Sequence, residues 1–107
     1  MHKRLFFLFF LISLSCSKKP PADVLSTEKM TDIITDLQLA DVAYKLELLP
    51  EVYKNQPQKY YLEILSAHQT DSATYNRSMI YYAENPQLLK KIYIGVEKNL
   101  QVQNIKK

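Results

Sequence analysis

Residues 27–48 read TEKMTDIITDLQLADVAYKLEL, and their spacing gives the strongest indication of the fold. Apolar residues recur every three or four positions, as they do along one face of an amphipathic helix. Ser26 is a suitable N-cap for this helix, and Glu28 lies in the first turn, where the helix dipole favours a negative charge. We therefore predict a helix over residues 27–48. Its expected buried stripe consists of Met30, Ile33, Ile34, Leu37, Ala40, Tyr44 and Leu48.

A second apolar strip lies on another face of the same helix. Its members, again at helical spacing, are Leu39, Val42, Leu46 and Leu49. A helix that is apolar on two sides is typically central to its bundle or bound to a partner. The first helix is therefore expected either to be surrounded or to bind another protein.

Three further helices are predicted downstream, over residues 58–67, 72–84 and 86–103. Thr70 or Asp71 can cap the third helix, and the pair Asn85-Pro86 separates it from the fourth. The residues expected to face inward are Tyr61, Ile64, Leu65 and His68, then Tyr75, Met79 and Tyr82, then Leu89, Ile92, Tyr93, Val96 and Leu100.

Glycine is almost absent, since Gly95 is the only one in 107 residues. Tight hairpins and phosphate-binding loops need glycine for positive φ and for close backbone approach, so Rossmann, P-loop and meander folds are improbable. The sequence therefore predicts an all-α fold, a small bundle of three to four helices that forms a single domain over residues 25–107.

The N-terminal segment, residues 1–15, has the layout of a cleaved signal peptide: a basic start, an apolar run and small polar residues. The run is too short to span a membrane as a permanent helix. Residues 13–16, Ser-Leu-Ser-Cys, resemble the lipobox of bacterial lipoproteins, which implies that Cys16 takes the lipid and becomes the new N-terminus. The alternative is an ordinary signal peptide with an incidental cysteine, which would leave one unpaired thiol in an oxidising compartment.

Residues 16–24 contain two lysines and two prolines and are expected to form an extended tether. We therefore expect a protein of the cell envelope, attached to a membrane through Cys16 and facing the periplasm. Without Lys3 and Arg4 the chain has 12 basic and 11 acidic residues, a balance that offers no basic surface for nucleic acid.

Catalytic chemistry is poorly represented in the domain. Its one histidine, His68, lies two residues from Ser66, and side chains at that spacing diverge on a helix. We predict no catalytic residue, and we expect His68 to lie half-buried at a helix end. Scattered carboxylates with a single histidine also do not form a zinc or calcium site, so no metal and no cofactor are expected.

Binding is the more promising role, and five residues are candidates for it. Asp36 ends an acidic series with Glu28 and Asp32, which is either a solvated edge or a contact strip for a basic partner. Asp41 falls within the apolar stripe, where it needs a tyrosine hydroxyl, Arg77 or a lysine as partner, or else forms the polar floor of a groove. The remaining candidates are Tyr60, Tyr81 and Tyr82, of which Tyr60 and Tyr81 are expected to face outward.

Three motifs together resemble a known family: LSTEKM at residues 25–30, DLQLAD at 36–41, and YYAENP at 81–86 with a trailing Ile92-Tyr93. They are similar to short lipoproteins of the Bacteroidota lineage that form a domain of unknown function. The likeness covers residues 23–100 and implies a helical, envelope-anchored protein without an assigned activity. Such proteins tend to have a glycine where this chain has Gln69, so the turn after the second helix is expected to be strained or to begin early.

These observations favour a non-enzymatic binding or adaptor module that recruits or supports another envelope protein. One alternative is a chaperone-like holder of unfolded or lipid-bearing clients, which would rely on grooves lined by tyrosine. An envelope enzyme is the most remote alternative, because the domain lacks a recognisable catalytic group.

Overall fold

The computed structural model describes residues 20–106, and within them it shows an all-α domain of four helices without strands, as the sequence predicts. The predicted leader and Cys16 lie outside the described residues. One short 3-10 helix, η1, interrupts the connection after the first described helix. The elements are α2 (Thr27–Lys45), η1 (Glu51–Tyr53), α3 (Pro57–Ala67), α4 (Ser72–Ala83) and α5 (Pro86–Lys106).

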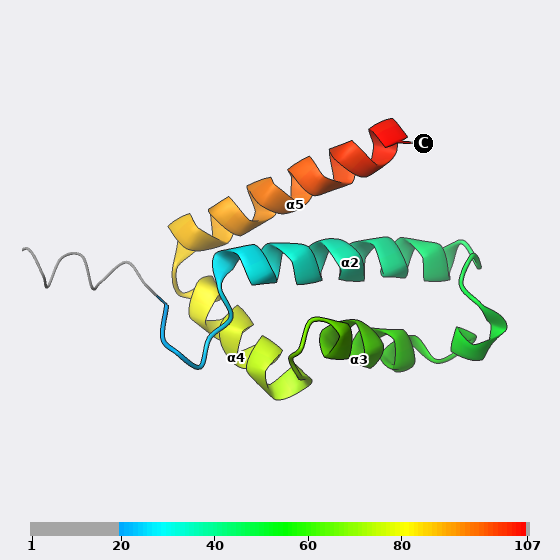
Figure 1. Ribbon diagram of the computed structural model, residues 1–107, viewed down its shortest axis with the longest axis horizontal. Helices are drawn as coiled ribbons and strands as arrows, with labels where there is room; N and C mark the ends of the chain where they lie inside the picture. The colour runs from blue at the N-terminus through cyan, green and yellow to red at the C-terminus, as the bar shows by residue number, and fades with distance from the viewer. Residues whose placement is uncertain (1–19, 107) are drawn as a thin grey trace, which may run out of the picture.

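Helix α2 is the centre of the arrangement. It runs side by side with α5, and both helices point in the same direction, because α3 and α4 return the chain along the opposite side of α2 before α5 begins (Figure 1). Helix α3 packs on another side of α2, and α4 contacts α3 and α5. The central position expected for the first helix is therefore correct over its N-terminal half, where α5 covers it.

The hydrophobic core lies at that N-terminal half. Its buried members, brought together from α2, α4 and α5, are Met30, Ile34, Tyr82, Ile92 and Val96. The predicted inward positions are confirmed at these residues. Two others are wrong: Tyr93 is exposed on α5, and Leu48 is 72% exposed because α2 ends before reaching it.

Two side chains cap the helices as the sequence indicates. The Ser26 hydroxyl accepts a hydrogen bond from the Lys29 amide at 3.1 Å at the start of α2. Asp71, rather than Thr70, caps α4 by accepting from the Thr74 amide at 2.8 Å. Hydrogen bonds from Thr74 lower the pKa of the Asp71 carboxyl, since they stabilise its charged form.

Helices α2 and α3 both end in a Schellman motif, but neither has glycine at the left-handed position. At the end of α2, the Leu48 amide donates to the Ala43 carbonyl at 2.8 Å, and Glu47 has a φ of 57°. At the end of α3, the Thr70 amide donates to the Leu65 carbonyl at 3.0 Å, and Gln69 has a φ of 58°. The strained turn expected at Gln69 is thus confirmed, and the same motif explains why α2 stops at Lys45.

Replacing either left-handed residue by glycine should stabilise the domain. We expect Glu47→Gly and Gln69→Gly each to raise the free energy of unfolding by about 1 kcal/mol, because glycine has no Cβ penalty at positive φ. Urea denaturation measures the change. Lys91→Gly on the exposed face of α5 is the matched control, and it should lower stability by about 1 kcal/mol. A loss of stability in both turn variants would contradict this account of the two helix ends.

The single glycine serves a different purpose, the close approach of α5 to α2. A Cβ built on Gly95 would lie 2.8 Å from the Thr31 Cγ2 atom. One turn further along, the Asn99 amide donates to the Thr35 hydroxyl at 3.2 Å. Small and polar residues therefore form the tight part of the α2–α5 seam.

The segment before α2 is bound firmly to α4. The Leu25 amide donates to the buried Ser78 hydroxyl at 2.9 Å, and the Tyr82 hydroxyl donates to the Leu25 carbonyl at 2.7 Å. Arg77 adds a hydrogen bond to the Asp23 carbonyl at 3.2 Å. We call these contacts the Leu25 clamp. Residues 23–25 are consequently part of the folded unit rather than of a free tether.

Candidate functional site

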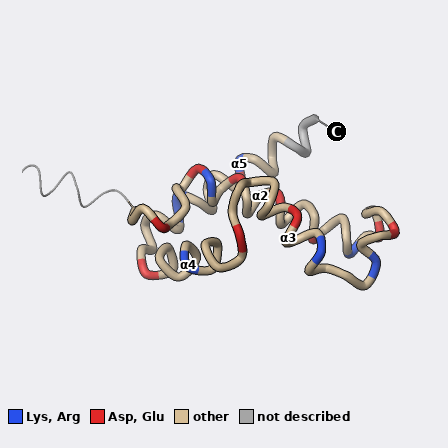
Figure 2. Tube along the Cα trace, turned by 60° about the horizontal axis from the view of Figure 1, so that its bottom comes forward, with Lys and Arg blue, Asp and Glu red and all other residues tan. Residues whose placement is uncertain are grey.

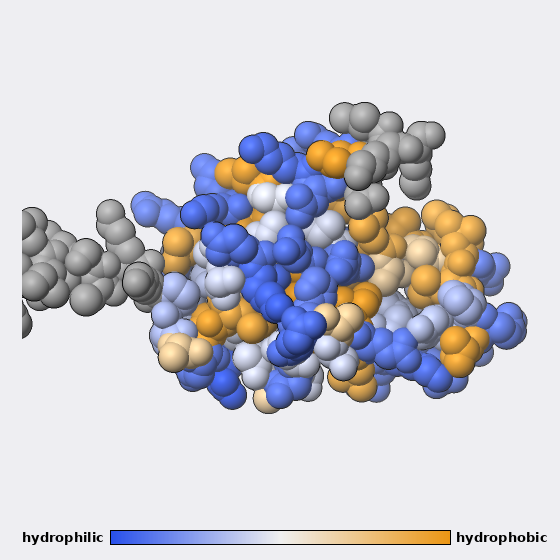
Figure 3. Space-filling view, viewed as in Figure 1, coloured by the Kyte–Doolittle hydropathy of each residue, from blue (hydrophilic) through white to orange (hydrophobic). Residues whose placement is uncertain are grey.

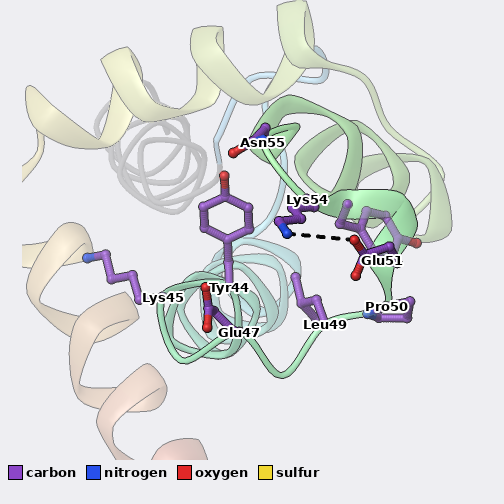
Figure 4. Close-up of a pocket in the computed structure, with 9 residues that line it drawn as sticks. Tyr44, Lys45, Glu47, Leu49, Pro50, Glu51, Lys54 and Asn55 are labelled. Atoms are coloured by element: carbon purple, nitrogen blue, oxygen red, sulfur yellow. Dashed lines mark ion pairs between the residues drawn. The ribbon is translucent and has the colours of Figure 1, made fainter.

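A cleft of about 470 Å³ opens where α2 ends. One wall comes from the last turn of α2 and the connection after it, and the other comes from η1 and the residues that follow (Figure 4). Tyr44 stands in the middle, with its hydroxyl directed toward the side of the cleft that carries Asn55. Its other principal lining residues are Glu47, Pro50, Glu51, Tyr53 and Lys54.

Tyr60 of α3 forms the support beneath this cleft. Its ring centre lies 5.6 Å from that of Tyr44, tilted by 35°, and 6.4 Å from that of Tyr53, nearly edge-on at 80°. Tyr60 is buried, so the prediction that it faces outward is wrong. The reason is that α3 contacts both α2 and η1, which leaves this side of the helix covered.

Asp41, which lies on α2, accepts a hydrogen bond from Tyr60. The Tyr60 hydroxyl donates to its carboxylate at 3.3 Å, and the Lys45 ammonium lies 3.1 Å from the other carboxylate oxygen. The predicted tyrosine and lysine partners are confirmed, whereas Arg77 binds Asp23 instead. Asp41 is half-exposed rather than central to an apolar stripe, because the core does not extend to this part of α2. Burial, and then the Asp41 charge, raises the pKa of Tyr60.

The rim of the cleft is polar and balanced in charge. The Tyr53 hydroxyl donates to the Glu63 carboxylate, and this hydrogen bond raises the pKa of Tyr53. Lys54 lies 3.8 Å from Glu51. The lining contains two lysines and two glutamates, and charges of both signs are interspersed along the described chain (Figure 2). The cleft therefore presents no excess of one sign.

Asp36 has a partner that the sequence did not reveal. Its carboxylate lies 2.7 Å from His68 Nε2, so this pair joins α2 to the end of α3. His68 is partly buried at the C-cap of α3, which agrees with the helix-end position predicted for it. Between residues 20 and 106, no group of three histidine, cysteine or acidic side chains is placed to hold a metal ion.

The two tyrosines on α4 differ in exposure, and Tyr82 faces inward as predicted. Tyr82 is fully buried, and Tyr81 packs edge-on against it with ring centres 5.1 Å apart. Tyr81 is half-buried beside the core. Tyr82 has no exposed surface to offer a partner, whereas Tyr81 keeps part of its side chain accessible.

The second apolar strip of α2 remains largely uncovered. Helices α2 and α5 separate toward their C-terminal ends, and apolar surface appears beside the end of α5 and over the end of α2 (Figures 1 and 3). Val42 is 54% exposed and Leu46 is 62% exposed, while Val102 on α5 is 49% exposed. With Leu39, these three residues form what we call the open seam, the continuation of the Thr31–Gly95 contact.

Sequence reasoning found the strip but missed the cleft. The cleft depends on Tyr53, Glu47 and Asn55, which come from connections whose path no periodicity defines. The available signal was the pair Pro50 and Pro57, which brackets a short segment that contains Tyr53. That signal indicates a structured turn but not the wall of a cleft.

Comparison with known proteins identifies a family for this chain. A family model described as "Domain of unknown function (DUF4296)" matches residues 21–106, which is most of the chain. No curated protein and no solved structure matches it. None of the helices in residues 20–106 is both long and apolar enough to cross a membrane.

Proposed function

The chain belongs to the DUF4296 family, a domain of unknown function, and we propose a function from its own residues. We propose that it is a non-enzymatic binding module that holds a helix of a partner protein in the open seam. The observation that carries this proposal is the uncovered apolar strip on α2. A small domain normally buries a run of large apolar residues, and an exposed run of this kind indicates a binding surface.

The geometry of the seam favours a helix as the bound element. Leu39, Val42 and Leu46 are spaced by three and four residues, which is the spacing by which one helix packs against another. The two helices approach closely at Gly95, and the open end carries Leu39, Val42 and Leu46 on α2 and Val102 on α5. A partner helix with an apolar stripe would complete a three-helix contact at this end.

Site-specific photo-crosslinking tests this proposal in the intact protein. A crosslinking residue at Val42 should join a single partner protein, and the same residue at Ile80 should not. Ile80 is the matched control because it is 62% exposed on α4, away from the seam. Equal capture at both positions, or a broad set of proteins at Val42, would argue against a specific partner. The second result would favour the chaperone-like holder.

A charge placed in the seam should abolish the crosslink. We expect Leu46→Asp to eliminate partner capture at Val42 while changing the free energy of unfolding by less than about 0.5 kcal/mol, because the side chain is exposed. Ile80→Asp should leave capture unchanged. Co-purification and urea denaturation of the two variants measure both effects. Unchanged capture in Leu46→Asp would place the partner elsewhere.

The proposal includes a lipid anchor on Cys16, which would hold this module at a membrane of the cell envelope. It rests on the lipobox-like sequence and on the position of Cys16 before a proline-containing tether. Multiple acyl chains give a stable anchor, whereas one chain binds only marginally. The chain enters the domain at the Leu25 clamp, at the end of the molecule opposite the open seam (Figure 1), so an anchor on that side would leave the seam accessible.

Replacing the cysteine tests the anchor. We expect Cys16→Ala to move the protein from the membrane fraction to the soluble fraction, because no thiol remains to carry the lipid. Fractionation followed by immunoblotting measures the distribution. Ser17→Ala is the control and should remain with the membranes. A membrane-bound Cys16→Ala protein would exclude lipidation of this residue as the means of attachment.

A further inference from the structure

We propose that the cleft at the end of α2 binds a neutral saccharide. This site is separate from the open seam, since Tyr44 lies two residues beyond Val42 and side chains at that spacing point to opposite sides of a helix. The inference therefore goes beyond the proposed partner site and does not depend on it.

The aromatic rings of the cleft are held in place by other side chains. Tyr44 and Tyr53 both pack on the buried ring of Tyr60, whose own hydroxyl is held by Asp41. The Tyr53 hydroxyl is held by Glu63. These contacts limit ring rotation before any ligand arrives, and preorganisation of this kind reduces the entropy lost on binding. The C–H face of a sugar ring can pack against such a surface.

Polar groups surround these rings. The Glu47 carboxylate, the Asn55 amide and the Tyr44 hydroxyl come from the two walls of the cleft. A carboxylate accepts at two oxygens, and an amide both donates and accepts, so each can bind two neighbouring hydroxyl groups. Such groups match a ligand whose edge is lined with hydroxyls.

The charged side chains of the cleft indicate which class of ligand it can bind. Lys54 is paired with Glu51, and Lys45 is paired with Asp41 and points away from the other labelled side chains (Figure 4). Both lysines of the lining are therefore already paired and neither is free for an anion, while the one further carboxylate, Glu47, is too little acidic charge to select a cation. A purely apolar ligand would leave the rim groups without hydrogen-bond partners. A neutral, hydroxyl-rich ring with one apolar face satisfies all these conditions.

The test is a titration of ¹⁵N-labelled protein with cellotriose, maltotriose and N,N′-diacetylchitobiose, followed by NMR. We expect at least one of these sugars to shift the Tyr44, Glu47 and Asn55 amides, with a dissociation constant near 1 mM, as suits a shallow open site. Acetate and methylammonium serve as charged probes and should give no shifts at these amides.

Three variants make the result specific. Asn55→Gly should weaken sugar binding about tenfold and keep the native spectrum elsewhere, because the side chain is exposed and glycine accepts the left-handed backbone at this residue, whose φ is 61°. Tyr44→Ala should abolish binding, and Tyr93→Ala, which removes an exposed tyrosine on α5, should leave it unchanged. The proposal is overturned if none of the sugars shifts the cleft amides, if a charged probe alone does so, or if Tyr93→Ala has the same effect as Tyr44→Ala.

Discussion

Replacing Tyr82 by alanine should lower the free energy of unfolding by about 3–5 kcal/mol, the largest effect expected from any single substitution in this domain. The ring is fully buried among residues of α2 and α5, and its removal would leave a cavity in the core. A domain of this size has a total stability of only about 5–10 kcal/mol. The variant should therefore be largely unfolded at moderate urea concentrations.

Tyr82→Phe distinguishes the contribution of the hydroxyl to stability from that of the ring. It keeps the buried volume but removes the 2.7 Å hydrogen bond to the Leu25 carbonyl, and we expect a loss of about 1–2 kcal/mol. Urea denaturation followed by circular dichroism measures both variants. If Tyr82→Phe were as damaging as Tyr82→Ala, the Leu25 clamp rather than core packing would dominate. If neither changed stability, the placement of α4 against the core would be wrong.

Gly95→Ala should also destabilise the domain, although alanine is the better helix former. The added Cβ would lie 2.8 Å from Thr31 Cγ2. Thr31 cannot easily rotate, because its hydroxyl donates to the Thr27 carbonyl at 2.7 Å. Overpacking costs about 1–3 kcal/mol, and helix propensity returns about 1 kcal/mol, so we expect a net loss of up to about 2 kcal/mol.

Thr31→Ala provides the control for this clash. It removes the atom that a Cβ at residue 95 would meet, so the double variant should be more stable than the sum of the two single changes predicts. Thermal denaturation of the four proteins closes the double-mutant cycle. A stabilising Gly95→Ala substitution, or additive effects in the double variant, would show that α2 and α5 do not approach each other closely here.

The positions of the helices could be predicted from the sequence because local chemistry marks their boundaries. Ser26, Asp71 and the Asn85-Pro86 pair each signal a helix start, and each helix begins where they indicate. The C-terminal ends were less predictable. Glu47 and Gln69 occupy positions that normally belong to glycine, so the end of α2 lacked its usual sequence signal.

Burial was predicted less well than helicity, for a physical reason. The spacing of apolar residues defines a face, but it does not say how far along a helix a neighbour remains in contact. Ile34 is buried in the core that α2 shares with α5, whereas Leu46 and Leu48 are exposed beyond the point where the helices separate. The exposure predicted for Tyr60 was wrong for the same reason, because its burial depends on the path of η1.

The Leu25 clamp also determines how this domain responds to mechanical force. A pull on the N-terminal side reaches the folded unit at Asp23 and Leu25, and their hydrogen bonds pass the load to Arg77, Ser78 and Tyr82 on α4. The tension is thus taken up at one end of the molecule, by the buried side chains of Ser78 and Tyr82 and by Arg77 at the surface. The C-terminal halves of α2 and α5 lie at the other end of the molecule (Figure 1), so the partner helix that we propose between them would not be released by a pull on the N-terminal side.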